Sequence, residues 1–263
     1  MKYRKLMLWM CFLLFSNVVF SNEIIVQNVS SNVYVLTGKD YGTNIGLIEI
    51  ADKLILIDPM PGETHFYQLD KTINEIVGKR PSYILNTHNH SDHTGGNAYF
   101  KSNGAQVLET SLIADSVQAI GVNSHSSKDT LYYLKGSNIL FVGDVYDTSW
   151  HPTFYSGGTK GFNEAIKTIL NIADAQTIIV PGHGPIANKA ALVTFRDNTN
   201  AWIERISYLH YQGLSTEMIM KDEQALTILE MFSANNKSPV LPEKAISRFI
   251  ERTISVVESE HKH

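Results

Sequence analysis

Apolar residues recur along the chain in two alternating rhythms: short runs rich in β-branched residues, and longer stretches with helical spacing. The pair Asn44–Ile50 and Lys53–Ile57 predicts a hairpin, joined by Ala51-Asp52. The other short runs predict strands at Ile24–Val26, Val33–Leu36, Tyr83–Leu85, Gln106–Leu108, Val117–Val122, Thr130–Leu134, Asn138–Val142 and Thr177–Val180.

The helical pattern is clearest in residues 63–78, where apolar side chains recur every three or four positions up to Gly78. The same criteria predict a helix starting near Asn97 and helices at Ser111–Val117, Gly161–Ala173, Lys189–Tyr211, Asp222–Phe232 and Pro242–Glu258. The order of several strands followed by a helix occurs twice along the chain. This order predicts an α/β fold in which two sheets lie face to face with helices outside. We expect residues 22–263 to form one domain with a C-terminal helical extension.

The first 21 residues have the pattern of a secretory signal peptide. Three cations, Lys2, Arg4 and Lys5, precede the apolar run 6–15, and Val19-Phe20-Ser21 offers a cleavage site after Ser21. The alternative, a membrane anchor, is disfavoured because the run falls short of the roughly 20 residues that span a bilayer. We therefore expect an exported protein, periplasmic or secreted, without a stable membrane anchor after cleavage.

The composition is that of an ordinary globular protein: 263 residues, 43% hydrophobic, 18% charged, formal net charge −4. Removal of residues 1–21 lowers the charge to about −7 and removes Cys11, the only cysteine. The mature chain then has neither a disulfide nor a thiolate metal ligand. Its acidic balance argues against a nucleic-acid partner.

The strongest chemical signal is the run His88-Asn89-His90-Ser91-Asp92-His93, which follows the predicted buried strand Tyr83–Leu85 directly. Three imidazoles and a carboxylate within six residues predict a transition-metal site. Such ligands suit zinc, with iron, manganese or nickel as alternatives. The alternative is a purely structural role, with Asp92 as an N-cap carboxylate and the histidines exposed in a loop. It does not explain the further candidate ligands downstream.

Three further candidates lie at the ends of other predicted strands. His125 precedes a strand, Asp144 ends the run Leu140-Phe141-Val142-Gly143, and His183 lies in Pro181-Gly182-His183-Gly184. Glycines beside a ligand let its side chain reach into a crowded site. Each candidate is weak alone, but together with the histidine run they predict one shared centre.

The chain resembles the metallo-β-lactamase superfamily over roughly Val26 to Asn188. The matching motifs are Thr87-His88-Asn89-His90-Ser91-Asp92-His93-Thr94-Gly95-Gly96, the turn at His125, Phe141-Val142-Gly143-Asp144, Pro181-Gly182-His183-Gly184, and Asp58 in Leu56-Ile57-Asp58-Pro59. The resemblance implies an αββα sandwich of two mixed sheets with outer helices, which agrees with the predicted elements. It also implies that Asp58 supports the site.

Carried over to this chain, the resemblance implies two zinc ions with seven ligands. One ion would be held by His88, His90 and His125; the other would be held by Asp92, His93 and His183, with Asp144 bridging both. Such a pair lowers the pKa of water, so that a hydroxide can attack a carbonyl carbon. Asp92 is the implied catalytic residue, which orients the water and carries protons. The implied substrate is a small molecule with an ester, thioester, lactone or amide carbonyl.

Two departures from the family pattern leave alternatives open. The commonest β-lactamase classes have a cysteine where Asp144 stands, so the ligand set resembles that of glyoxalase II and lactonases; a genuine β-lactamase is the first alternative. Only 31 residues separate His93 from His125, fewer than in most relatives. A metal-binding protein with a degenerate, non-catalytic site is therefore the second alternative.

Overall fold

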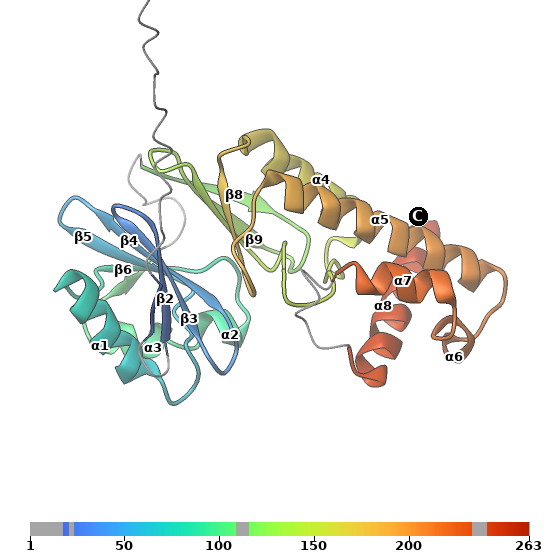
Figure 1. The fold of residues 1–263 in the computed structure, drawn as a ribbon, viewed down its shortest axis with the longest axis horizontal. Helices are drawn as coiled ribbons and strands as arrows, with labels where there is room; N and C mark the ends of the chain where they lie inside the picture. The colour runs from blue at the N-terminus through green and yellow to red at the C-terminus, as the bar shows by residue number, and fades with distance from the viewer. Residues whose placement is uncertain (1–17, 21–23, 109–115, 233–240, 263) are drawn as a thin grey trace, which may run out of the picture.

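Two β-sheets lie face to face, with helices on their outer sides, in the computed structural model, which describes residues 18–20, 24–108, 116–232 and 241–262 (Figure 1). The first sheet has seven strands among these residues, in sequence order. Strands β1 to β5 pair antiparallel, and β5, β6 and β7 pair parallel. The strands are β1 (Val18–Phe20), β2 (Ile24–Ser30), β3 (Val33–Gly38), β4 (Asn44–Ile50), β5 (Lys53–Ile57), β6 (Tyr83–Leu85) and β7 (Gln106–Val107).

The second sheet has the order β11-β10-β9-β8 in the described part of the chain. Its strands are β8 (Val117–Val122), β9 (Asp129–Leu134), β10 (Ile139–Gly143) and β11 (Ile178–Pro181). The β10–β11 pair is parallel and the other two pairs are antiparallel. Both sheets are therefore mixed, which confirms the predicted fold class.

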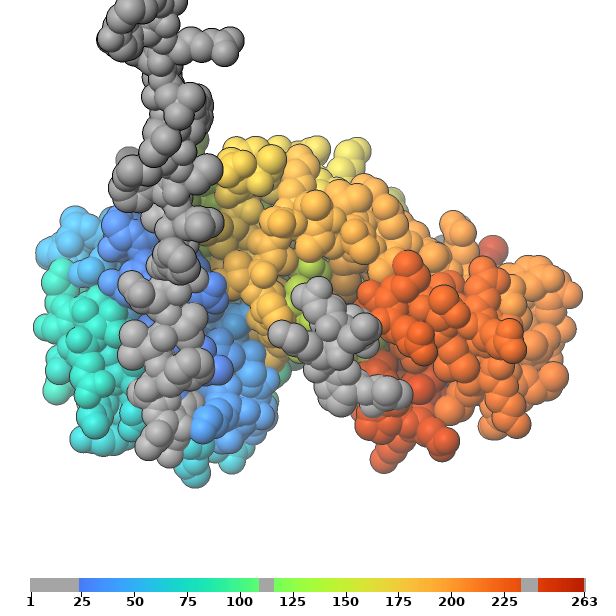
Figure 2. Space-filling model, in the orientation of Figure 1, coloured from blue at the N-terminus to red at the C-terminus, as the bar shows by residue number. Residues whose placement is uncertain are grey.

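Helices cover the outer face of each sheet (Figure 1). The first sheet is covered by α1 (Phe66–Val77) and α3 (Asn97–Ser102), while the short α2 (Ser91–Thr94) follows β6. The second is covered by α4 (Gly158–Ile172) and α5 (Lys189–Tyr211). The chain continues into α6 (Thr216–Ile219), α7 (Glu223–Glu230) and α8 (Glu243–His261), at the opposite end of the molecule from the first sheet (Figures 1 and 2).

Alternating side chains on the strands build three apolar layers. In β10, Ile139 and Phe141 face the first sheet, whereas Leu140 and Val142 face the helices. The inter-sheet layer is tight at Gly46, where an added Cβ would lie 2.7 Å from the Phe141 ring. The alternation explains why the strands read as nearly continuous apolar runs, because both of their faces are buried.

The C-terminal extension is held by aromatic stacking between α5 and α8. The Trp202 and Phe249 rings stack with centroids 4.3 Å apart and an interplanar angle of 3°. The Trp202 indole N–H donates to Thr253 Oγ1 at 2.9 Å. These contacts join the extension to the core over the second sheet.

Most predicted elements are present, with small shifts at their ends. The first helix begins at Phe66 rather than at residue 63, and Gly78 ends it in a left-handed conformation with φ 63°. The predicted helix Ser111–Val117 lies largely outside the described residues, and Val117 begins β8. The predicted signal peptide also lies outside them, apart from Val18–Phe20. In the described part of the chain, none of the helices has the length and apolar character to cross a bilayer.

Candidate metal centre

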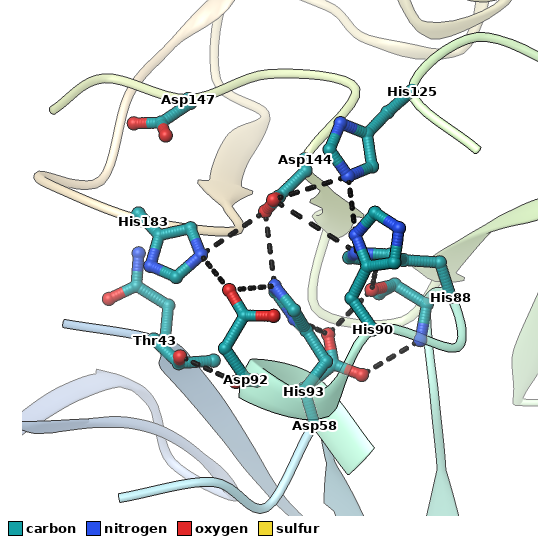
Figure 3. A network of polar contacts seen from close by, with 12 residues as sticks. Thr43, Asp58, His88, His90, Asp92, His93, His125, Asp144, Asp147 and His183 are labelled. Atoms are coloured by element: carbon teal, nitrogen blue, oxygen red, sulfur yellow. Dashed lines mark hydrogen bonds and ion pairs between the residues drawn. The ribbon is translucent and has the colours of Figure 1, made fainter. Parts of the chain in front are cut away.

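Four chain segments bring the candidate ligands to one edge of the sandwich, between the two sheets (Figure 3). The segment after β6 supplies His88, His90, Asp92 and His93. Asp144 follows β10, His183 follows β11, and His125 lies in the loop between β8 and β9. All seven predicted ligands, His88, His90, Asp92, His93, His125, Asp144 and His183, lie together in two adjacent groups.

The first group consists of His88, His90 and His125, whose candidate ligand atoms all lie within 4.8 Å of one another. His90 Nδ1 lies 3.1 Å from His88 Nε2 and 2.9 Å from His125 Nε2. His125 thus reaches the centre despite the short connection from His93. His88 is buried and His90 is exposed, so the group opens to solvent on the His90 side.

The second group consists of Asp92, His93, Asp144 and His183. His93 Nε2 lies 3.2 Å from Asp144 Oδ1 and 3.8 Å from Asp92 Oδ2. His183 Nε2 lies 3.4 Å from an oxygen of each carboxylate. His93 is fully buried, whereas the Asp92 side chain is 33% exposed and forms the open side of this group.

Asp144 lies between the two groups and directs a different oxygen to each. Its Oδ1 faces His93 and His183, at 3.2 and 3.4 Å. Its Oδ2 faces His125 and His88, at 3.5 and 4.0 Å. One oxygen of Asp144 therefore faces each group.

A separate observation supports metal binding by these side chains. His93 Nε2 and Asp144 Oδ1 are buried, and neither has a hydrogen bond of acceptable geometry to any described residue. Buried polar atoms without a partner are rare and costly in folded proteins. A cation between these two atoms would satisfy both, and nitrogen and oxygen donors of this kind suit zinc.

A second layer of contacts fixes the rings. Asp58 Oδ2 lies 3.0 Å from His93 Nδ1, and the same carboxylate accepts from the Thr87 N–H and hydroxyl at 2.8 and 2.6 Å. The carbonyl of Tyr41 lies 3.0 Å from His183 Nδ1. A carbonyl can only accept, so His183 donates from Nδ1 and turns Nε2 toward the centre. Asp58 therefore supports the site as the resemblance implied.

Burial and neighbouring charges set the protonation of the metal-free site. Burial lowers the pKa of His88 to about 3. Burial also opposes protonation of His93 and His183, but Asp58 and Asp144 raise the pKa of His93 to about 11, while Asp92 and Asp144 raise that of His183 to about 9. Two imidazolium groups thus balance the carboxylates without metal, and bound cations would replace their protons.

The carboxylates respond in the opposite direction. The contact with His183 lowers the pKa of Asp92 to about 2, against the effect of burial. Burial likewise opposes ionisation of Asp144, yet His93, His183 and His125 together hold its pKa well below the usual range. Both carboxylates are therefore ionised at neutral pH, as metal ligands must be.

Some residues that position the ligands could not be predicted from the sequence. Asn44 has no local signal: its side-chain amide donates to the carbonyls of Pro181 and Gly184, at 3.0 and 2.8 Å, on both sides of His183. Thr153 lies against the His125 ring, with its hydroxyl 2.5 Å from Nδ1. Their partners are 28 to 140 residues away in sequence, so no local pattern could identify them.

Comparison with known proteins gives a consistent result. Residues 38–111 match the metallo-beta-lactamase superfamily. The chain is 28% identical over 171 residues to the probable hydroxyacylglutathione hydrolase glo2 of Schizosaccharomyces pombe, covering 55% of this chain and 65% of that protein. It is 31% identical over 103 residues to the metallo-beta-lactamase type 2 of Elizabethkingia meningoseptica, covering 37% and 41%. The chain thus spans less than two thirds of the length of either relative.

Two solved structures show the same fold. A crystal structure of VMB-1 superimposes with a TM-score of 0.57 at 17% identity, covering 68% of this chain and 97% of that one. A metallo-beta-lactamase from Pontibacter korlensis gives a TM-score of 0.57 at 20% identity, covering 66% and 98%. Nearly all of each structure is therefore matched, while about a third of this chain has no counterpart in either.

Proposed function

This chain belongs to the metallo-β-lactamase superfamily, and from that premise we propose that it is a dinuclear, zinc-dependent hydrolase. Its substrate is a small molecule with a carbonyl group in an ester, thioester, lactone or amide. His88, His90 and His125 hold one ion, and Asp92, His93 and His183 hold the other. Asp144 bridges the two.

The observation that supports this proposal most strongly is the division of the Asp144 carboxylate between the two groups. Oδ1 faces the second group and Oδ2 faces the first. A carboxylate that served a single cation would not need His88 and His125 against its other oxygen. The buried atoms His93 Nε2 and Asp144 Oδ1, which lack a hydrogen bond of acceptable geometry, point to the same centre.

Two bound cations supply Lewis acidity, which polarises a substrate carbonyl and lowers the pKa of water. The residues of the chain provide position and proton transfer. Asp92 is ionised and its side chain is 33% exposed, so its carboxylate can accept a hydrogen bond from the attacking water and carry a proton toward the leaving group. The open side formed by His90 and Asp92 admits the substrate, while fully buried His93 and largely buried Asp144 keep their orientation.

We also propose that the protein acts outside the cytoplasm, with residues 1–21 removed. The cationic start, the short apolar run and the small residue at position 21 support export. The mature chain has no cysteine, so all its ligands are imidazoles and carboxylates, which need no reducing compartment.

The test is a substrate panel on the mature, zinc-loaded chain: a thioester, a lactone, a simple ester and the lactam nitrocefin. We expect turnover of at least one of the first three, and a loss of about 100-fold or more in Asp92→Asn, because a positioned acid or base contributes roughly 10²–10⁴. Asp174→Asn, a change of an exposed carboxylate outside the centre, is the matched control. Metal binding without turnover of any carbonyl substrate would refute the proposal and favour the degenerate-site alternative.

A genuine β-lactamase is the second candidate, and the named similarity to type 2 metallo-beta-lactamases favours it. The same panel distinguishes the two. Nitrocefin turnover that exceeds thioester and lactone turnover supports the lactamase. Thioester or lactone turnover without nitrocefin turnover leaves it unsupported.

A further inference from the structure

The loop that carries His125 is held from inside by a single buried carboxylate. It comprises residues 123–128 and joins β8 to β9, where Val122 pairs with Asp129. Asp129, the first residue of β9, is only 3% exposed. It belongs to neither ligand group.

Asp129 binds both sequence neighbours of His125. Its Oδ2 accepts the backbone N–H of Ser124 at 3.0 Å. The backbone N–H of Ser126 lies 3.0 Å from Oδ1 and 3.1 Å from Oδ2, and the Ser126 hydroxyl donates to Oδ1 at 2.6 Å. The peptide groups 123–124 and 125–126, which flank Ser124-His125, are thereby fixed to one carboxylate, and this sets the direction in which the histidine side chain leaves the backbone.

A separate contact fixes the rotation of the ring. His125 Nδ1 lies 2.5 Å from Thr153 Oγ1 and 3.2 Å from the Thr153 carbonyl. The carbonyl can only accept, so Nδ1 donates and Nε2 is bare, 2.9 Å from His90 Nδ1. Thr153 sets the tautomer, whereas the position of the whole residue depends on Asp129.

We infer that Asp129 is the positioning residue of the three-histidine metal site: its carboxylate places His125 at the centre and so compensates for the short connection from His93. This inference rests on the proposed two-metal function. Asn at position 129 keeps one acceptor oxygen but turns the other into an NH₂ group. At the Oδ1 position the NH₂ group would face the Ser126 N–H, and at the Oδ2 position it would face the N–H groups of both neighbours, so either orientation of the amide sets a donor against a donor.

The experiment titrates the zinc-free, mature chain with Zn²⁺ in competition with a chromophoric chelator. We expect Asp129→Asn to weaken one metal by about 10- to 100-fold, the usual effect of removing an outer partner of a ligand. The other metal, on Asp92, His93, Asp144 and His183, should stay within about threefold of the wild-type affinity. In the Co²⁺-substituted protein, the visible absorption of the three-histidine site should be lost selectively.

The control is Asp222→Asn. Asp222 also anchors a backbone N–H, that of Ala225 at 2.8 Å, and pairs with Arg205 far from the centre. It should lower the melting temperature while leaving both metal affinities unchanged. An Asp129→Asn protein with two wild-type affinities overturns the inference, and so does one whose two metals weaken equally.

Ser126→Ala provides a milder variant: it deletes the hydroxyl contacts with Asp129 and with the Lys128 N–H, and it leaves the N–H groups of Ser124 and Ser126 on the Asp129 carboxylate. Should Asp129→Asn not fold, selective weakening of the three-histidine metal in Ser126→Ala supports the inference, and unchanged affinity overturns it. Failure of the proposed function is seen separately, in the wild type: binding of fewer than two metals there, or no effect of His125→Ala, refutes the dinuclear centre itself.

Discussion

Acidification should destabilise the protein through His151, which lies outside the ligand set. This ring is 6% exposed and stacks on Phe249, with centroids 4.1 Å apart and an interplanar angle of 11°. Its Nδ1 donates to the Pro152 carbonyl at 2.9 Å. Burial lowers the pKa of His151 to about 4, with a smaller contribution from Arg252. The folded protein therefore holds a neutral imidazole, whereas the unfolded chain binds a proton near its ordinary pKa of about 6.5.

The direction and size of the change in the free energy of unfolding follow from proton linkage. Because the unfolded state binds the proton more tightly, the contribution is fully present above pH 6.5 and is lost as the pH falls toward 4. A difference of about 2.5 pKa units amounts to about 3 kcal/mol in total. Between pH 7.5 and pH 5, about 2 kcal/mol of this is lost.

The assay compares urea unfolding of the zinc-free wild type and His151→Phe at both pH values. Phenylalanine keeps the stacking and does not titrate, so the other ionisable groups cancel in the difference. The wild type should lose about 2 kcal/mol more than the variant on going to pH 5. Equal losses in the two proteins would show that this ring is not held neutral in the folded state. The loop that contains His151 also carries Asp144 and Thr153, so protonation of His151 should also disturb the candidate metal centre.

Three further changes test the site and its supports. Asp144→Asn should lower zinc content and reduce kcat by about 100-fold or more, since it weakens both ligand groups at once; unchanged metal content by mass spectrometry would contradict a bridging role. Asn44→Ala should cost about 2–3 kcal/mol in urea unfolding, because the carbonyls of Pro181 and Gly184 lose their donor; the affinity of the His183 metal should fall about 10-fold, and an unchanged affinity counts against this support. Chelation of both metals should lower the melting temperature, because a site filled at 1,000-fold its Kd adds roughly 4 kcal/mol to the free energy of unfolding; a chelator without effect in a thermal scan would exclude metal-linked stability.

The sequence predicts local elements well where the pattern is strong. The hairpin Asn44–Ile50 with Lys53–Ile57 and the long helix Lys189–Tyr211 have the predicted bounds, because β-branched alternation and a long helical period are both unambiguous. The four-residue helix Thr216–Ile219 is not predicted. One helical turn gives too few apolar repeats to stand out from a loop.

Prediction of the site is limited by distance along the chain. The run His88 to His93 identifies a metal site, because its ligands are neighbours in sequence. Whether His125 reaches the centre depends on Asp129 and Thr153, and hence on the register of β8 against β9, which spacing alone does not determine. The role of Asn44 depends on the contact of β4 with the end of β11, across 137 residues or more.

The proposed function depends on the seven ligands forming one two-metal centre. The most direct measurement is the number of zinc ions bound per mature chain, determined by mass spectrometry after equilibrium dialysis against zinc. We expect two per chain in the wild type and one in His125→Ala, because that change removes a ligand from the first group only. One ion or none in the wild type, or two in the variant, would contradict it.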